Sequence, residues 1–431
     1  MTRHPMATTG SARRARRAVA AAAALLLGVA ATAPAHAADG GQWWYDLYDV
    51  PAAHAEGWTG EGVKIAVIDA QINPDLPVFD GADLTVMEDP LCANSGPAIS
   101  TEFNDDSSHG TTVTAMLVGN GEGAGAVRGI APDASVIYYG WGLVGEETCE
   151  LPAEVEDRTL TGGGWGMLRA LEDGAQIITT SVGSSSYSLA DMQVMAEAIA
   201  RGVVVLSAST NESGVATANF PNALNGVVTV NAMDADGEIQ KDKETGELAI
   251  EPEATVVAAG VDIDVIGAGG SWDNTGPATG ASLASPIVAG MLALTWQKYP
   301  EATANQLVQS LIHNTWADDH PLERDTVNGY GYGAASLGHL LREDPTQYPD
   351  ENPLMDKKFG FPNADDVAIA AGESEDLMPV IPDAPASRPS FDWTSIGVTA
   401  GAVGAVAVVA SVIIVLVTRR RKPQPPAPPA L

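Results

Sequence analysis

The sequence has few basic residues and few cysteines for its length. Lys and Arg number 22 against 55 Asp and Glu, which gives a net charge of −33. Nine of the basic residues lie within residues 3–17 and 419–422, so the chain between them carries 13 basic residues and a net charge of −42. A field of that sign repels nucleic acid and anionic lipid, and it favours solubility and cationic partners. We therefore expect no nucleic-acid partner.

Residues 1–37 have the pattern of a secretory signal peptide. Basic residues come first, an apolar run covers residues 19–29, and Ala35-His36-Ala37 supplies a cleavage site flanked by small side chains. A membrane anchor is the alternative, but this run is too short to span a bilayer.

A second apolar segment, residues 396–417, contains no charged residue. As a helix it would be about 33 Å long, enough to cross a bilayer. Basic residues follow at 419–422, and the preference for positive charge on the inner side places the tail, residues 418–431, in the cytoplasm. A buried helix at the chain end is the alternative. We predict a single-pass protein of the cell membrane with its main domain outside the cytoplasm.

Cys92 and Cys149 are the only cysteines. An even number in an exported chain predicts one disulfide, and two separate buried thiols are the alternative. A zinc site would need further Cys or His ligands at suitable spacing, and none accompanies these two.

Between residues 43 and 341, short Val- and Ile-rich runs alternate with helical stretches, as in a parallel sheet covered by helices. The predicted strands are residues 64–68, 135–139, 176–181, 203–208 and 227–230. The predicted helices are residues 109–118, 166–172, 190–201, 282–298 and 304–313. The fold class is α/β, in one domain. Residues 342–394 are acidic and rich in Pro, and we expect an extended linker to the membrane helix.

Three polar residues stand at the edges of apolar elements. Asp69 ends the strand run VKIAVID, His109 opens the helix HGTTVTAMLVG, and Ser282 opens the helix in GASLASPIVAG. Strand carboxyl ends and helix N-termini line one crevice in an open parallel sheet, so these side chains can meet. Singly, Asp69 and Ser282 could be caps and His109 a core histidine. Together they supply the carboxylate, imidazole and hydroxyl that activate a serine nucleophile.

Asn211 follows the strand run VVVLSAS. Attack of a serine on a peptide carbonyl creates an oxyanion, and the Asn211 amide is a candidate donor to it. The backbone N–H of Ser282, at the positive end of its helix, would be the second donor. A turn residue is the alternative reading of Asn211.

These segments resemble the subtilase family, peptidase family S8, over residues 43–341. The usual motifs of that family are close to DTG or DSG, HGTHVAG, AAGN and GTSMAAP, and this chain has DAQ, HGTTVTA, SASTN and GASLASP. The order Asp, His, Ser is that of the subtilisins and differs from the orders of trypsin-like enzymes and α/β-hydrolases. The resemblance implies a subtilisin-like three-layer domain, with a mainly parallel central sheet flanked by helices, and serine endopeptidase activity.

The order of the segments, from signal peptide through single domain and acidic linker to terminal anchor, is most similar to that of the mycosins. Mycosins are membrane-anchored subtilases associated with type VII secretion, so the similarity implies a protein or peptide substrate and such a secretion complex as partner. We expect no required cofactor. Subtilases often bind structural calcium, but no segment here has a recognisable ligand spacing, so no metal ligand is assigned.

The resemblance also implies a substrate-binding region. Its residues are Ser181, Val182, Gly183, Ala208, Ser209 and Thr210. The first three would pair with the substrate backbone by β-augmentation. The last three would form a wall of the primary specificity pocket, where Thr210 replaces a usual Gly and predicts a preference for small side chains.

Departures from the family motifs leave other functions open. Ala70 and Gln71 replace Thr or Ser and Gly after Asp69, and Ala281 replaces the usual Thr before Ser282. A catalytically weak domain that serves as a structural or peptide-binding component of a membrane secretion complex is therefore the main alternative. Another serine hydrolase is a third reading, although GASLA lacks the GxSxG elbow.

Overall fold

The computed structural model describes residues 41–123, 127–143, 149–153, 159–184, 187–214, 220–316 and 322–372. The predicted signal peptide, transmembrane helix and cytoplasmic tail lie outside these residues, as does the part of the predicted linker after residue 372. Within the described ranges, no helix is both long and apolar enough to cross a membrane.

Seven parallel strands form the central sheet, in the order β2-β3-β1-β4-β5-β6-β7. They are β1 (Lys64–Asp69), β2 (Leu84–Met87), β3 (Ser135–Gly140), β4 (Ile177–Thr180), β5 (Val204–Ala208), β6 (Val227–Met233) and β7 (Val256–Ala259). All five predicted strands are confirmed. The two edge strands, β2 and β7, were not predicted, because runs of four residues are too short for periodicity to separate them from loops.

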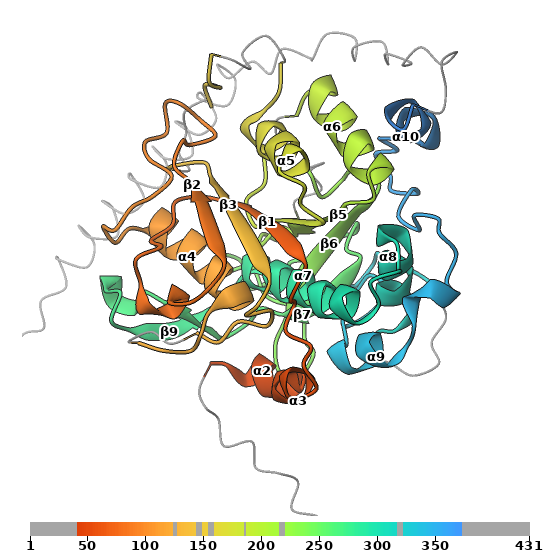
Figure 1. Ribbon diagram of the computed structural model, residues 1–431. Coiled ribbons are helices and arrows are strands. Elements are labelled where there is room, and N and C mark those ends of the chain that lie inside the picture. The colour runs from red at the N-terminus through yellow and green to blue at the C-terminus, as the bar shows by residue number, and fades with distance from the viewer. Residues whose placement is uncertain are drawn as a thin grey trace, which may run out of the picture. The chain divides into compact units, whose positions relative to one another are not determined.

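Helices cover both faces of the sheet and make three layers (Figure 1). Helices α4 (Asp105–Val118) and α7 (Ala281–Lys298) lie on one side, and α5 (Gly162–Glu172) and α6 (Leu189–Ala200) lie on the other. Successive strand residues point to opposite faces, so Val67 joins the core around α4 and α7, whereas Ile68 joins the core around α5 and α6. This arrangement confirms the predicted three-layer α/β domain.

Shorter elements surround these layers. They are the helices α2 (Trp43–Leu47), α3 (Val50–Ala55), α8 (Ala304–His313), α9 (Leu337–Arg342) and α10 (Ala364–Ala370), the antiparallel pair β8 (Ile263–Ile266) and β9 (Thr275–Ala278), and the 3-10 turns η1 (Pro77–Phe79), η3 (Ala268–Gly270) and η4 (Pro345–Gln347).

Helix α4 begins at Asp105, four residues before the predicted start at His109. The Asn104 side chain accepts a hydrogen bond from the Ser107 N–H (2.7 Å), and the Ser107 hydroxyl accepts one from the Asn104 N–H (3.0 Å). This reciprocal cap, with two acidic residues in the first turn, stabilises the earlier start. The prediction that His109 opens the helix is therefore wrong: it lies in the second turn.

The folded region continues past residue 341, where we predicted that the linker begins. Residues 343–372 include η4 and α10, and α10 packs against α6. Leu354 is fully buried, and its carbonyl accepts the N–H of Gly226 (2.9 Å), while the Asn225 N–H donates to the Phe361 carbonyl (2.7 Å). The linker prediction is wrong for residues 343–372, because acidic, Pro-rich composition does not reveal that the backbone groups find partners on the domain.

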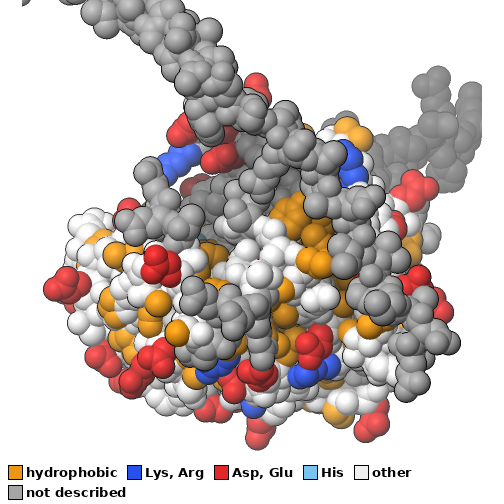
Figure 2. Space-filling model, turned by 90° about the horizontal axis from the view of Figure 1, so that it is seen from above, with side chains coloured by type: hydrophobic (Ala, Val, Ile, Leu, Met, Phe, Trp, Pro, Cys, Tyr) orange, Lys and Arg blue, Asp and Glu red, His pale blue; other side chains and the backbone are white. Residues whose placement is uncertain are grey.

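The surface carries the excess of acidic residues that the composition requires. On the face in Figure 2, Asp and Glu side chains are more frequent than Lys and Arg over the described part of the chain. Apolar side chains gather in a recess of the same face.

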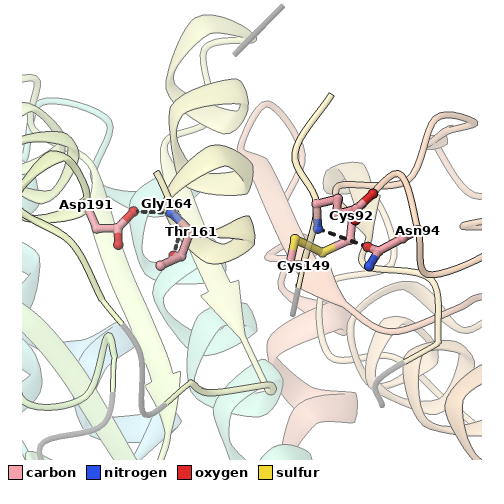
Figure 3. Close-up of a disulfide and its surroundings, with 7 residues drawn as sticks. Cys92, Asn94, Cys149, Thr161, Gly164 and Asp191 are labelled. Carbon is pink, nitrogen blue, oxygen red and sulfur yellow. Dashed lines mark hydrogen bonds between the residues drawn. A yellow bond between two sulfur atoms is a disulfide. The ribbon is translucent and has the colours of Figure 1, made fainter. Parts of the chain in front are cut away.

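A disulfide joins Cys92 to Cys149 and confirms the predicted pairing (Figure 3). Its sulfur atoms lie close to Gly162 at the start of α5. A Cβ atom added to Gly162 would lie 2.8 Å from the Cys149 sulfur. Two hydrogen bonds also join the loops: the Ala93 N–H donates to the Glu150 carbonyl (2.7 Å), and Asn94 accepts the N–H of Glu150 (2.9 Å). The start of α5 is thus packed against a covalently closed pair of loops.

Candidate active site

Asp69 and His109 are joined by a hydrogen bond. Asp69 ends β1 and is fully buried, and its Oδ1 accepts the Ala70 N–H and the His109 Nδ1–H, each at 2.7 Å. With the proton held on Nδ1, the Nε2 atom of the neutral ring carries the lone pair and can take a proton. The His109 side chain is 34% exposed, so a substrate can reach it.

The surroundings of His109 shift its pKa. Burial of the ring is the largest influence and lowers the pKa, but the charge of Asp69, its hydrogen bond and the charge of Asp106 together outweigh it. The net result is a pKa above the ordinary value for histidine. The site therefore favours the imidazolium ion that general-base catalysis must form.

Gly110 allows α4 to approach the end of β1. A Cβ atom there would lie 2.0 Å from the Tyr138 hydroxyl oxygen and 2.3 Å from the Gln71 carbonyl oxygen, so any larger residue would displace the helix. The Tyr138 hydroxyl donates to the Ala70 carbonyl (3.1 Å). Close packing of this helix against the loop brings His109 to Asp69.

Gln71 occupies the position where the family motif has Gly. Its side chain is buried, donates from Nε2 to the Pro97 carbonyl (2.9 Å) and accepts at Oε1 from the Asn104 side chain (2.9 Å). It therefore ties the Asp69 loop to the cap of α4. The sequence offered no signal for this role, because both partners are distant along the chain.

Ser282 is the second residue of α7 and is 9% exposed. Ile68 pairs with Thr180 in the sheet, so the residues that come next, Asp69 and Ser181, lie at the neighbouring carboxyl ends of β1 and β4. The Ser181 hydroxyl donates to the Ser282 carbonyl (2.9 Å). These contacts place Ser282 at the same carboxyl edge of the sheet as Asp69.

Asn211 lies beside Ser282. Its Oδ1 accepts the N–H of Ala281 (2.9 Å), which leaves the Nδ2 donors directed elsewhere. A Cβ atom added to Gly280 would lie 3.1 Å from the Ser282 Oγ and 3.5 Å from the Asn211 Nδ2, so both atoms border the small space that this glycine leaves open. The Ser282 hydroxyl and the Asn211 amide thus lie close to the same point.

Two features of the described residues differ from a fully bonded triad. No hydrogen bond joins the Ser282 hydroxyl to His109, and the buried Oδ2 of Asp69 has no hydrogen-bond partner. Bonds between nucleophile and base are often long before substrate binds and tighten in the complex. Ala70 donates to Asp69 through its N–H and has no side-chain hydroxyl.

A small apolar pocket lies beside this edge, lined by Ile68, Trp141, Gly163, Met167, Thr180, Val182, Ser184, Phe220 and Pro221. Val182 and the exposed Gly183, both in the segment predicted to bind substrate, directly follow β4. Ala208, Ser209 and Thr210 do not line this pocket. Ser209 instead donates from its hydroxyl to Asn231 (2.9 Å), and the Thr210 carbonyl accepts from Gln240 (3.2 Å).

The family resemblance allows structural calcium, but the sequence assigned no ligand to it. Over the described ranges, the side chains of His, Cys, Asp and Glu form no group of three or more that could hold a metal ion. No ligand is assigned.

Comparisons with known proteins agree with the sequence resemblance. Residues 60–333 match the subtilase family, peptidase family S8. Subtilisin E from Bacillus subtilis (strain 168) is 30% identical over 275 residues, which cover 62% of this chain and 63% of Subtilisin E. The chain therefore spans less than two thirds of that relative.

Solved structures share the fold. MycP1 from Mycobacterium smegmatis has a TM-score of 0.54 at 19% identity, covering 72% of this chain and 86% of its own. Fervidolysin from Fervidobacterium pennivorans, a keratinolytic enzyme related to subtilisin, has a TM-score of 0.53 at 23% identity, covering 70% of this chain and 45% of its own. At such identities the likeness concerns the fold, and the predicted subtilisin-like domain is confirmed.

Proposed function

The chain belongs to the subtilase family, and we propose on this basis that it is a serine endopeptidase that hydrolyses peptide bonds through Asp69, His109 and Ser282. One observation carries the proposal: the imidazole bonded to Asp69 and the hydroxyl bordering the Asn211 amide lie at one edge of the sheet.

The proposed reaction follows the serine peptidase scheme. The His109 Nε2 takes the proton of the Ser282 hydroxyl as Oγ bonds to the substrate carbonyl carbon, and Asp69 stabilises the resulting imidazolium. The Asn211 Nδ2 and the Ser282 N–H donate to the oxyanion. His109 then protonates the leaving amine as the peptide C–N bond breaks. Water, activated by the same imidazole, hydrolyses the acyl-enzyme and restores Ser282.

Substrate would bind as an added strand along the segment that follows β4. Ser181, Val182 and Gly183 lie there, next to the apolar pocket, so main-chain hydrogen bonds would hold the peptide and the pocket would accept one of its side chains. The family resemblance assigns Thr210 to the wall of the primary specificity pocket. We propose a preference for small side chains at the scissile position, tested by comparing peptides with Ala and Phe there in the unaltered protein and in Thr210→Gly.

The proposed location is the outer face of the cell membrane. The sequence of residues 396–417, followed by basic residues at 419–422, supports a single anchor with a cytoplasmic tail. We further propose association with a type VII secretion complex, on the similarity of domain order to the mycosins. Proteinase treatment of intact cells should remove the domain and spare an epitope tag on the tail; protection of the domain would contradict this location.

A catalytically weak domain that binds peptides or supports a secretion complex is the second candidate. The buried Asp69 Oδ2 without a hydrogen-bond partner and the absence of a hydroxyl at Ala70 favour it. Such a domain would keep the substrate-binding segment and lose turnover.

Labelling with a fluorophosphonate separates the two candidates. We expect rapid labelling of the purified protein and none of Ser282→Ala. Ser285→Ala is the matched control, because Ser285 lies one turn further along α7 and bonds to Thr179 (3.0 Å), away from the proposed nucleophile. Equally weak labelling of the unaltered protein and Ser282→Ala would exclude the peptidase. A peptide-library digest with Ser282→Ala as blank would then define the cleaved bonds.

A further inference from the structure

The loop that carries Asn211 contacts a hairpin inserted between β6 and β7. Residues 239–249 turn back on themselves, with Lys241 bridged to Leu248. The hairpin is attached to β6, because the Gln240 N–H donates to the Ala232 carbonyl (3.0 Å). Its turn contacts the chain just after β5.

Asp242, which is 6% exposed, makes that contact. Its Oδ2 accepts both the N–H (2.8 Å) and the hydroxyl (2.9 Å) of Ser213. Its Oδ1 accepts the N–H groups of Glu244 (2.7 Å) and Thr245 (3.1 Å) within the hairpin turn. One carboxylate therefore fastens the turn to a residue two positions beyond Asn211.

The hairpin and β6 also hold the other side of this loop. Gln240, nearly fully buried, donates to the Thr210 carbonyl (3.2 Å), and the fully buried Asn231 accepts the hydroxyl of Ser209 (2.9 Å). The backbone on both sides of Asn211 is thus fixed by side chains that lie outside the proposed triad.

Asn211 itself is exposed, and among the described residues its side chain makes one hydrogen bond, accepting the Ala281 N–H. A donor to an oxyanion must lie about 2.7–3.1 Å from it, and a misplacement of about 1 Å can reduce the rate about 10²-fold. We propose that Asp242 is a positioning residue for the peptidase reaction: by holding Ser213, it fixes the backbone that aims the Asn211 amide at the oxyanion. This inference rests on the proposed function.

The chemistry of the contact calls for a carboxylate. Hydrogen bonds from the Ser213 N–H, which is the largest influence, and from Thr245 and Glu244 hold the pKa of Asp242 well below its ordinary value. An Asn at this position would keep the shape but present an NH2 group to N–H donors in either orientation. Asp242→Asn therefore loosens the contact without removing volume.

The test is a double-mutant cycle on a peptide substrate. We expect Asp242→Asn to lower kcat about tenfold with KM changed less than twofold, because the oxyanion forms only in the transition state. In the Asn211→Ala background the same substitution should have no further effect, since the donor that it positions is gone. Should Asp242→Asn fail to fold, Ser213→Ala, which removes only the hydroxyl donor, should show the same pattern with a smaller loss.

Asp234→Asn is the matched control. Asp234 lies in the connection between β6 and the hairpin and accepts the N–H groups of Asp236 and Glu238, each at 2.9 Å. Within the described part of the chain, its side chain makes no hydrogen bond to residues 209–213. It should keep full kcat.

Each result decides the inference. Equal kcat for Asp242→Asn and Asp234→Asn overturns it, as does a further loss from Asp242→Asn in the Asn211→Ala background. A rise in KM with unchanged kcat would place Asp242 in substrate binding and also overturns it. If the unaltered protein shows no turnover and labels no better than Ser282→Ala, the proposed function fails and this inference with it. An active protein with a normal Asp242→Asn variant defeats only the inference.

Discussion

Lys357 should make the stability of the protein depend on pH. Its side chain is 3% exposed, and the amine donates to the Asn222 carbonyl (2.6 Å) and the Thr229 hydroxyl (2.8 Å). Burial lowers its pKa from the ordinary 10.5 to about 7, and the charge of Glu253 opposes this only in part. The lysine lies in the segment that we had expected to be linker.

The sign follows from proton binding. Between pH 7 and 10.5 the unfolded chain holds a proton on Lys357 that the folded chain has released. The free energy of unfolding should therefore rise with pH in this window, by about 1.4 kcal/mol per pH unit from this group and roughly 5 kcal/mol in all. Below about pH 7 both states are protonated, and the contribution of Lys357 becomes constant.

Urea denaturation at pH 7, 8, 9 and 10 measures this slope. All variants should carry Ser282→Ala to prevent self-digestion. Lys357→Met should flatten the dependence by about 1.4 kcal/mol per unit. At pH 10 it should also be less stable by about 1–3 kcal/mol, because the Asn222 carbonyl and the Thr229 hydroxyl each lose one hydrogen bond. The exposed neighbour supplies the control, Lys358→Met, which should keep the slope. An unchanged slope in Lys357→Met would refute the burial of this amine and the docking of residues 343–372.

Three further predictions concern the active site and the disulfide. Asn211→Ala should lower kcat by about 10²–10³ with little change in KM, measured on the same peptide, because one oxyanion donor is lost. Because the pKa of His109 is raised and the base must be neutral, kcat/KM should rise with pH through a pKa above the ordinary 6.5. An NMR titration should give a lower pKa for His109 in Asp69→Asn than in the unaltered protein. An equal pKa would contradict the ion pair between His109 and Asp69. Replacing Cys92 and Cys149 together by Ser should cost about 4 kcal/mol of unfolding free energy in urea, because the bridge closes a loop of 57 residues; a loss under 1 kcal/mol would speak against that account.

The central strands could be read from the sequence because each is a continuous Val- and Ile-rich run, which is what burial on both faces of a parallel sheet demands. Asp69 could be located because it ends such a run, and Ser282 because it lies at the start of an apolar helix. The helix start near His109 was misplaced because the cap at Asn104 depends on a reciprocal pair of side-chain bonds, and no apolar pattern marks it.

The fold class and the identity of the reactive groups follow from the residues alone, since hydrophobicity and chemical type are properties of each side chain. Which of these groups touch depends on long-range packing, and the three-dimensional structure was needed to show it. The bond from His109 to Asp69 spans 40 positions, and the contact of Asp242 with Ser213 spans 29. Likewise, the docking of residues 343–372 depends on buried donors and acceptors finding partners far along the chain, which composition does not encode.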